Sequence, residues 1–146
     1  MKNEFTIGVL GGMGTYATIH IFKQYAQLFP ATKEWERPRI IIDNRCTMPS
    51  RVDAYVNGRK RDVLVNMMTD SLLHLDLMGC DYIILGCLTS HLFIPEILDK
   101  HPDIKNKIVN LVELCTDQII DDGSDEVYLL ASEGTIESKI FQKALD

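Results

Sequence analysis

The stretch FTIGVLGGMGTYATIHIFKQYAQLFP, residues 5–30, decides the fold class. It begins with an apolar, partly β-branched run at 5–10 and continues through the glycines Gly11, Gly12 and Gly14. From about residue 16 its apolar positions recur at helical spacing until Pro30, which ends the helix. A buried strand that passes through a tight glycine turn into a helix is the building unit of α/β proteins. The stretch therefore predicts an α/β fold.

The rest of the chain repeats this alternation. Apolar runs predict strands over 39–44, 82–85, 108–111 and 127–131, the first of them covered on both faces because it is nearly all apolar. Helices are expected over 59–78, 95–100, 113–121 and 136–145, and strands separated by helices pair in parallel through crossover connections. We therefore expect a three-layer α/β/α domain with a mainly parallel sheet. One face of the longest helix carries Leu64, Met67, Met68, Ser71, Leu72 and Leu75.

Composition excludes several classes of protein. The chain has 146 residues, of which 46% are hydrophobic and 25% charged, so disorder is excluded. Its net charge of −6 argues against nucleic-acid binding, and the short basic run 59–61 is typical of a solvated helix start. No apolar run is long enough to span a membrane, and the N-terminus has no leader pattern. No C-x-x-C motif occurs, so we expect reduced thiols in a cytoplasmic protein; the cysteines are Cys46, Cys80, Cys87 and Cys115.

Four loops follow the carboxyl ends of the expected strands, where parallel sheets bind their ligands. They span residues 11–15, 45–53, 86–91 and 132–135, and all are rich in Gly, Ser, Thr, Cys or Arg. The agreement between the architecture and the chemistry of these loops predicts a small-molecule site at this edge of the sheet.

The third loop has the components of an activated thiol. Cys87 follows a strand and precedes two hydroxyls and His91, and a nearby imidazole can lower the pKa of a thiol. The alternative is that Cys87 is a small buried apolar residue, as most free cysteines are. His91 alone is equally compatible with a helix cap or an exposed helix position.

The first loop leaves a different function open. Gly12-x-Gly14-x-x-Ala17 matches the dinucleotide-binding fingerprint, and Asp43 ends the second strand where a ribose-binding acid would lie. A strand-to-helix turn with no ligand contact explains the same glycines. The dinucleotide hypothesis does not account for the other three loops.

Four motifs together resemble the aspartate/glutamate racemase family. They are IGVLGGMG at 7–14, MPSR at 48–51, CLTSH at 87–91 and ASEGTIES at 131–138, in the family's order and approximate spacing. The resemblance implies two similar flavodoxin-like halves with the site between them. It also implies racemisation of an acidic amino acid without a cofactor or a metal. One cysteine from each half flanks the α-carbon, because inversion through a planar carbanion needs an acid and a base on opposite faces.

The resemblance also implies roles for individual residues. Cys87 matches the catalytic cysteine of the first half, and Thr89 a threonine that holds the α-carboxylate. Arg51 matches the arginine that pairs with the distal carboxylate, a task suited to a planar guanidinium. Asn44 lies at a strand end near the substrate, and Thr135 in the turn that opens the second half. Three further binding candidates come from the same motifs: Gly12, Met13 and Ser90.

This chain departs from the family pattern at three of these motif positions. Leu88 stands where the family commonly has Asn, Ser50 where it has an acid, and Gly86 where it often has Pro. The first two changes remove groups that contact the substrate or orient the catalytic pair. The resemblance therefore leaves open whether aspartate, glutamate or another amino acid is the substrate.

The resemblance places the second catalytic cysteine beyond Asp146. We therefore expect a first domain at 1–112 and, at 113–146, a linking helix and the incomplete start of a second. The three other cysteines are expected to be core or surface thiols. Racemisation should be impaired in this chain, and we expect a homodimer. The alternatives are a related isomerase or decarboxylase that uses one cysteine, a non-catalytic binding or dimerising remnant, and the dinucleotide-binding domain.

Overall fold

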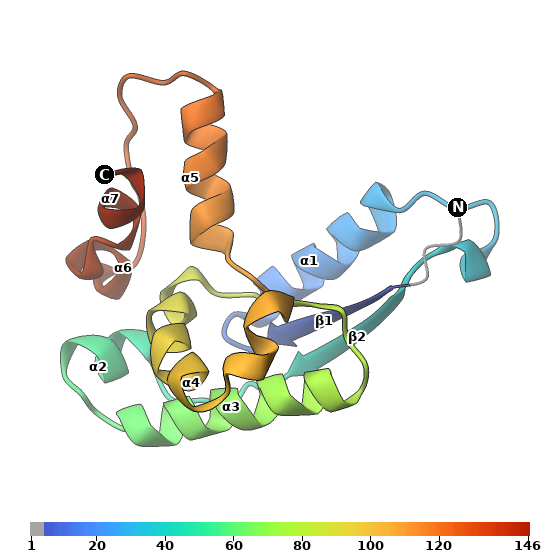
Figure 1. Cartoon of the computed structure of the whole chain (residues 1–146), viewed down its shortest axis with the longest axis horizontal. Coiled ribbons are helices and arrows are strands. Elements are labelled where there is room, and N and C mark those ends of the chain that lie inside the picture. Colours follow the sequence, from blue (N-terminus) through green and yellow to red (C-terminus); the bar gives the residue numbers. More distant parts are fainter. Residues whose placement is uncertain (1–4) are drawn as a thin grey trace.

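The computed structural model describes residues 5–146, and its centre is a parallel sheet (Figure 1). The strands are β1 (Thr6–Gly11), β2 (Arg39–Asn44), β3 (Tyr82–Leu85) and β4 (Ile108–Val109). Their order is β2-β1-β3-β4, and every neighbouring pair is parallel. The predicted α/β fold with a parallel sheet is confirmed. Because β1 is central, the loop after it lies between the loops that follow β2 and β3.

Helices cover this sheet on both sides. In Figure 1, α1 lies on one side of β1 and β2 and α3 on the other. The apolar face predicted for the long helix is the one that α3 buries, since Leu64, Met68 and Leu72 are fully buried in the main core. The helices are α1 (Thr15–Leu28), α2 (Arg51–Val56), α3 (Arg61–Leu77), α4 (Ile94–Lys100), α5 (Leu111–Asp121), α6 (Glu133–Ser138) and α7 (Ile140–Leu145), with short 3₁₀ turns at Glu34–Glu36 (η1), Leu88–Phe93 (η2) and Pro102–Lys107 (η3).

The turn between β1 and α1 requires glycine at position 12. Gly12 has a φ of +79°, and a Cβ there would lie 2.4 Å from the carbonyl carbon of Arg45. The backbone after β1 thus packs directly on the backbone after β2. This contact holds two of the four expected loops together.

Three local predictions were wrong. No strand forms over 127–131, which is exposed for most of its length, because it pairs with none of the described strands. The helix expected over 136–145 is split into α6 and α7, with Lys139 between them at a φ of +53°. The strand over 39–44 is an edge strand and only half-buried, rather than covered on both faces.

The segment after α5 folds back onto the rest of the molecule. A Cβ at Gly134 of α6 would lie 3.4 Å from Thr89 Cγ2 and 3.5 Å from the Cα of Val52 in α2. In α7, Phe141 is buried. Figure 1 shows α6 and α7 beside α5 and close to α2. The last 14 residues therefore complete the edge of the sheet where the predicted site lies.

Within residues 5–146, no helix is long and apolar enough to cross a membrane.

Candidate functional site

Arg51 lies at the first position of α2 and connects two loops. Ser50 caps this helix, because its hydroxyl accepts the Asp53 N–H. Arg51 Nη1 donates to the Pro49 carbonyl at 3.2 Å, and Nη2 donates to the Met13 carbonyl at 3.1 Å. Its Nε is buried and has no hydrogen-bond partner among the described residues. A buried guanidinium N–H without an acceptor is costly, so this group is suited to an anionic ligand.

Three hydroxyl groups meet where η2 contacts the start of α6. Thr89 Oγ1 lies 2.9 Å from Thr135 Oγ1 and 2.9 Å from Ser132 Oγ, and the last two are 3.1 Å apart. Thr89 and Thr135 are both buried. The structure thus brings together two predicted binding residues that are far apart in the sequence. Ser132 was not predicted individually, although its loop was.

Cys87 is half-buried and precedes η2. Its carbonyl oxygen accepts from the Ser90 N–H at 3.2 Å and from Ser90 Oγ at 2.5 Å, and the His91 ring lies 3.2 Å away. Ser90 is fully buried, and its hydroxyl donates to the Cys87 carbonyl within this turn. Its side chain therefore contributes to the position of Cys87.

His91 is buried and uses both ring nitrogens on the backbone. Nδ1 faces the Cys87 carbonyl, and Nε2 accepts the Leu111 N–H at 3.2 Å. Burial lowers the pKa of His91 below its usual value, although hydrogen bonds to backbone groups oppose this. The hypothesis that the imidazole activates the Cys87 thiol is therefore not supported by this geometry.

A second group of contacts lies at the end of β2. Asn44 Nδ2 donates to Cys46 Sγ at 3.2 Å, and Thr15 Oγ1 lies 3.3 Å from the same sulfur. Cys46 is exposed. The loop 11–15 contacts this group through Gly12 and Thr15, and it contacts Arg51 through the Met13 carbonyl. The loop therefore connects Arg51 with the end of β2.

The predicted site residues therefore lie near the ends of the strands in three sets of contacts. Arg51 contacts the Met13 carbonyl, although the Met13 side chain is in the core. Thr89 and Thr135 contact each other, and Gly12 and Asn44 lie in the third set, at the end of β2. The expectation for the other thiols is met, since Cys80 is buried and Cys46 and Cys115 are exposed. Burial raises the pKa of the Cys80 thiol.

The fold itself explains why glycine is needed at position 12 of the first loop, without a bound ligand. The Gly12 N–H donates to Thr18 Oγ1 at 3.1 Å, and the close approach that Gly12 permits is to the protein's own backbone. In a dinucleotide site the loop backbone would instead approach a pyrophosphate. The dinucleotide hypothesis is not favoured.

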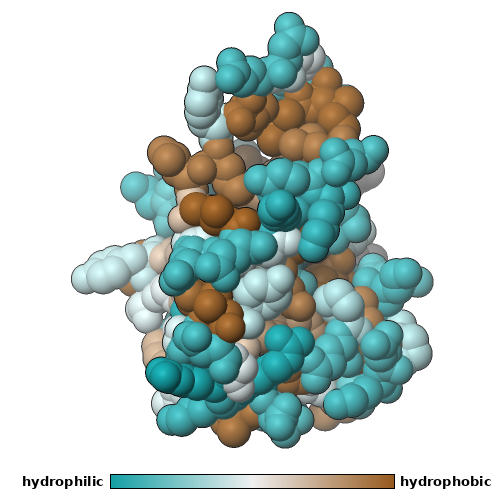
Figure 2. Space-filling model, turned by 90° about the vertical axis from the view of Figure 1, so that its left-hand side faces the viewer, coloured by the Kyte–Doolittle hydropathy of each residue, from teal (hydrophilic) through white to brown (hydrophobic). Residues whose placement is uncertain are grey.

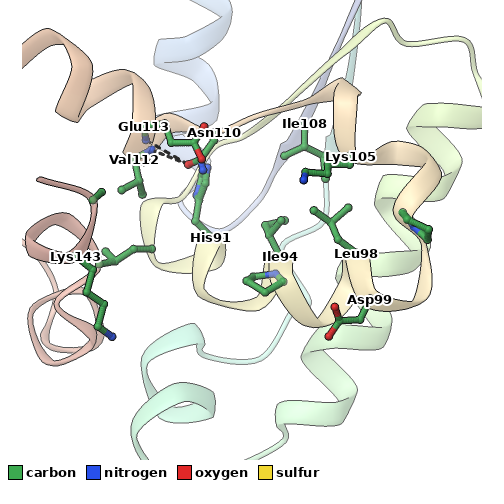
Figure 3. Close-up of a pocket in the computed structure, with 14 residues that line it drawn as sticks. His91, Ile94, Leu98, Asp99, Lys105, Ile108, Asn110, Val112, Glu113 and Lys143 are labelled. Carbon is green, nitrogen blue, oxygen red and sulfur yellow. Dashed lines mark hydrogen bonds between the residues drawn. The ribbon is translucent and has the colours of Figure 1, made fainter. Parts of the chain in front are cut away.

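A cavity of about 690 Å³ lies elsewhere, and neither Cys87 nor Arg51 lines it (Figure 3). It is bounded by α4, η3, α5 and α7, and His91 forms part of its wall. Because the residues with chemistry lie at the sheet edge, we place the site there. The described residues contain no group of three His, Cys, Asp or Glu side chains that could hold a metal ion.

Comparison with known proteins finds amino-acid racemases. The chain is 29% identical over 143 residues to the broad specificity amino-acid racemase RacX of Bacillus subtilis (strain 168). Its fold matches the aspartate racemase of Picrophilus torridus with a TM-score of 0.85 at 25% identity, over 97% of this chain and 58% of that one. The chain is similar in sequence and fold to known amino-acid racemases, among them an aspartate racemase. The resemblance drawn from the four motifs is confirmed.

A solved structure of lower sequence identity has the same fold. An aspartate racemase homologue from Pyrococcus horikoshii OT3 matches with a TM-score of 0.72 at 18% identity, over 99% of this chain and 60% of that one. No family model matches the sequence. The match to RacX includes 95% of this chain but only 60% of RacX. It therefore spans about three fifths of the racemases that it resembles.

Proposed function

We propose that this chain carries one half of a cofactor-independent racemase for an acidic amino acid, with Cys87 as one of two acid–base groups. In this proposal Arg51 binds the distal carboxylate, while Thr89 and Thr135 bind the α-carboxylate. Asn44 lies at the end of β2, where it contacts Cys46. The division into a first domain at 1–112 and the start of a second at 113–146 is part of the proposal.

The observation that carries the proposal is the free Nε of Arg51. Two of its guanidinium nitrogens hold loop carbonyls, so the plane of the group is fixed, while its buried Nε–H has no acceptor among the described residues. A carboxylate is the anion that a guanidinium edge binds best. The distal carboxylate of aspartate or glutamate would satisfy this donor once the groups that cover Nε move aside.

The reaction follows from ordinary thiol chemistry. The Cys87 thiolate takes the α-proton, so an S–H bond forms as the Cα–H bond breaks, and the electron pair passes into the α-carboxylate. Hydroxyl donors such as Thr89 and Thr135 stabilise the charge that develops there. A proton returned from the opposite face gives the enantiomer. Supporting observations are the half-buried thiol and the fixed turn that carries it.

The experiment is ligand protection of Cys87 from alkylation, read by peptide mass spectrometry. Aspartate or glutamate should slow labelling of Cys87, while alanine, which lacks the distal carboxylate, should protect weakly. Cys115, which is exposed on α5, is the internal control and should label at the same rate throughout. Equal protection by alanine and aspartate, or none by any of the three, would contradict the proposal.

We also propose that the chain forms a homodimer in the cytoplasm. Apolar side chains remain exposed on α5 and the segment after it, among them Leu114, Ile120, Tyr128 and Leu130. Figure 2 shows hydrophobic atoms gathered in the upper part of the molecule, where these segments lie. Burial of such surface against a second copy would stabilise the assembly. The four free cysteines suit a reducing compartment.

A further inference from the structure

The turn that carries Cys87 is connected to the start of α5 by one side chain. His91 lies 3.2 Å from the Cys87 carbonyl through Nδ1 and 3.2 Å from the Leu111 nitrogen through Nε2. The two backbone positions are far apart in the sequence and belong to different elements. Figure 3 shows the ring of His91 directed toward the start of α5, beside Asn110.

The second contact fixes the tautomer. A ring nitrogen that accepts an N–H carries no proton, so Nε2 is unprotonated and Nδ1 carries the hydrogen of the neutral imidazole. Nδ1–H then donates to the Cys87 carbonyl. We propose that His91, as the neutral Nδ1–H tautomer, is a positioning residue that holds the Cys87 turn against α5. Its meaning for catalysis rests on the proposed function, but the contact itself does not.

Helix α5 depends on the same side chain. The first N–H groups of a helix lack partners within it. Asn110 Oδ1 accepts the N–H groups of Val112 and Glu113, and His91 Nε2 accepts that of Leu111. His91 therefore completes the cap of α5, which leads to the segment with Ser132 and Thr135. The positions of Cys87 and of this segment are linked through one imidazole.

The surroundings of His91 favour its neutral form. It is buried, and the titratable or charged groups that share its cavity are Asp99 on α4, Lys105 on η3, Glu113 on α5 and Lys143 on α7. Among the described residues no carboxylate forms a salt bridge with His91. Without a carboxylate partner, burial opposes the imidazolium and lowers the pKa of His91, although hydrogen bonds to the backbone of Cys87, Val109 and Leu88 act in the other direction.

Three substitutions separate the two bonds. His91→Asn places an amide N–H where Nδ1 lies and keeps the bond to the Cys87 carbonyl, but it does not reach Leu111. His91→Gln reaches as far as Nε2 and can accept the Leu111 N–H, but it leaves the Cys87 carbonyl without this donor. His91→Ala removes both. His20→Ala, on the exposed face of α1, is the matched control for loss of an imidazole.

The readout is the alkylation rate of Cys87 in the full chain, measured at one fixed pH, with circular dichroism to verify folding. Loss of one hydrogen bond should raise the population of open turn, and the labelling rate, by roughly 2- to 10-fold. We expect this increase in His91→Ala and His91→Gln, with partial rescue in His91→Asn, which keeps the bond to the Cys87 carbonyl but loses the bond to α5, and no change in His20→Ala. Rates equal to the unmodified chain in all variants, or an increase in His91→Asn equal to that in His91→Ala, would overturn the proposal.

A measurement on the unmodified chain makes the test independent of variant folding. The ¹⁵N shifts of the His91 ring at pH 7 should identify a neutral imidazole with the hydrogen on Nδ1. Hydrogen on Nε2, or a doubly protonated ring, would overturn the proposal. Neither readout needs turnover or a bound amino acid. Failure of ligand protection at Cys87 would therefore contradict the proposed function alone.

Discussion

The hydroxyl oxygens of Thr89 and Thr135 lie 2.9 Å apart, although 46 positions separate the two residues in the chain. With Ser132 they form a closed triangle of hydrogen bonds. This contact joins η2, which follows Cys87, to α6. A double-mutant cycle tests it. Thr89→Val and Thr135→Val should each lower the free energy of unfolding by about 1 kcal/mol, and the double variant by less than the sum. Urea unfolding measures all three values; strict additivity would show that the hydroxyls do not interact.

Arg51 should determine the preference for a dicarboxylic ligand. Arg51→Ala removes a charge-assisted contact worth about 1.5–3 kcal/mol, so aspartate should bind roughly 10- to 100-fold more weakly. Alanine binding, which has no distal carboxylate to lose, should change far less. Titration calorimetry or Cys87 protection measures both. An equal loss for the two ligands would assign Arg51 a purely structural role through its bonds to Met13 and Pro49.

The close approach at Gly12 predicts a severe effect of a single methyl group. Gly12→Ala combines a positive φ with a contact of 2.4 Å to the Arg45 backbone. Gly58→Ala is the matched control, because its φ of +68° imposes the same strain in open space. The control should cost about 1–2 kcal/mol, and Gly12→Ala should cost a further 1–3 kcal/mol or more, about the range for overpacking. Thermal unfolding compares them, and similar losses would contradict the packing at position 12.

The lowered pKa of His91 predicts a dependence of stability on pH. A histidine whose pKa is lowered by folding stabilises the protein while it is neutral, so its contribution is complete above the usual value near 6.5. It is lost as the pH falls from there through the lowered value in the folded state. The free energy of unfolding should therefore decline below about pH 6.5, by at most about 1.4 kcal/mol per pH unit for one proton. His91→Gln should lack this part of the slope; an identical slope would contradict it.

The exposed apolar surface predicts self-association. Sedimentation velocity should detect a dimer, which Leu130→Asp should weaken. Leu130 is 96% exposed, so the substitution leaves the fold of one copy intact. Leu77→Asp, at an 83% exposed position at the end of α3, is the control and should remain dimeric. A monomer at all concentrations would contradict the homodimer proposal.

The sequence alone predicted the elements whose pattern is local. The strands at β1 and β3 and the buried face of α3 follow from apolar periodicity, and Leu64 and Leu72 lie where that pattern placed them. The strand over 127–131 did not form because a strand depends on a neighbour, which its own residues do not encode. Lys139 at a positive φ, which divides α6 from α7, carries no sequence signal for a break.

The candidate site divides in the same way. Cys87, Thr89 and Arg51 could be found because each belongs to a short motif at a strand end. The role of His91 could not, because it depends on Leu111, 20 positions away. Ser132 was missed for a similar reason, since its hydroxyl matters only once α6 lies against η2. Contacts between distant segments are where the structure adds most.

The central claim is that the Cys87 thiolate removes the α-proton of an acidic amino acid. The most direct measurement is incubation of L-aspartate and L-glutamate with the chain in deuterated water, followed by chiral separation and mass analysis. The account predicts α-deuterium in at least one of these amino acids, mainly with retention and with little of the D-isomer, and loss of that deuterium in Cys87→Ala. No deuterium above the level of Cys87→Ala, or equal deuterium in both proteins, would contradict it.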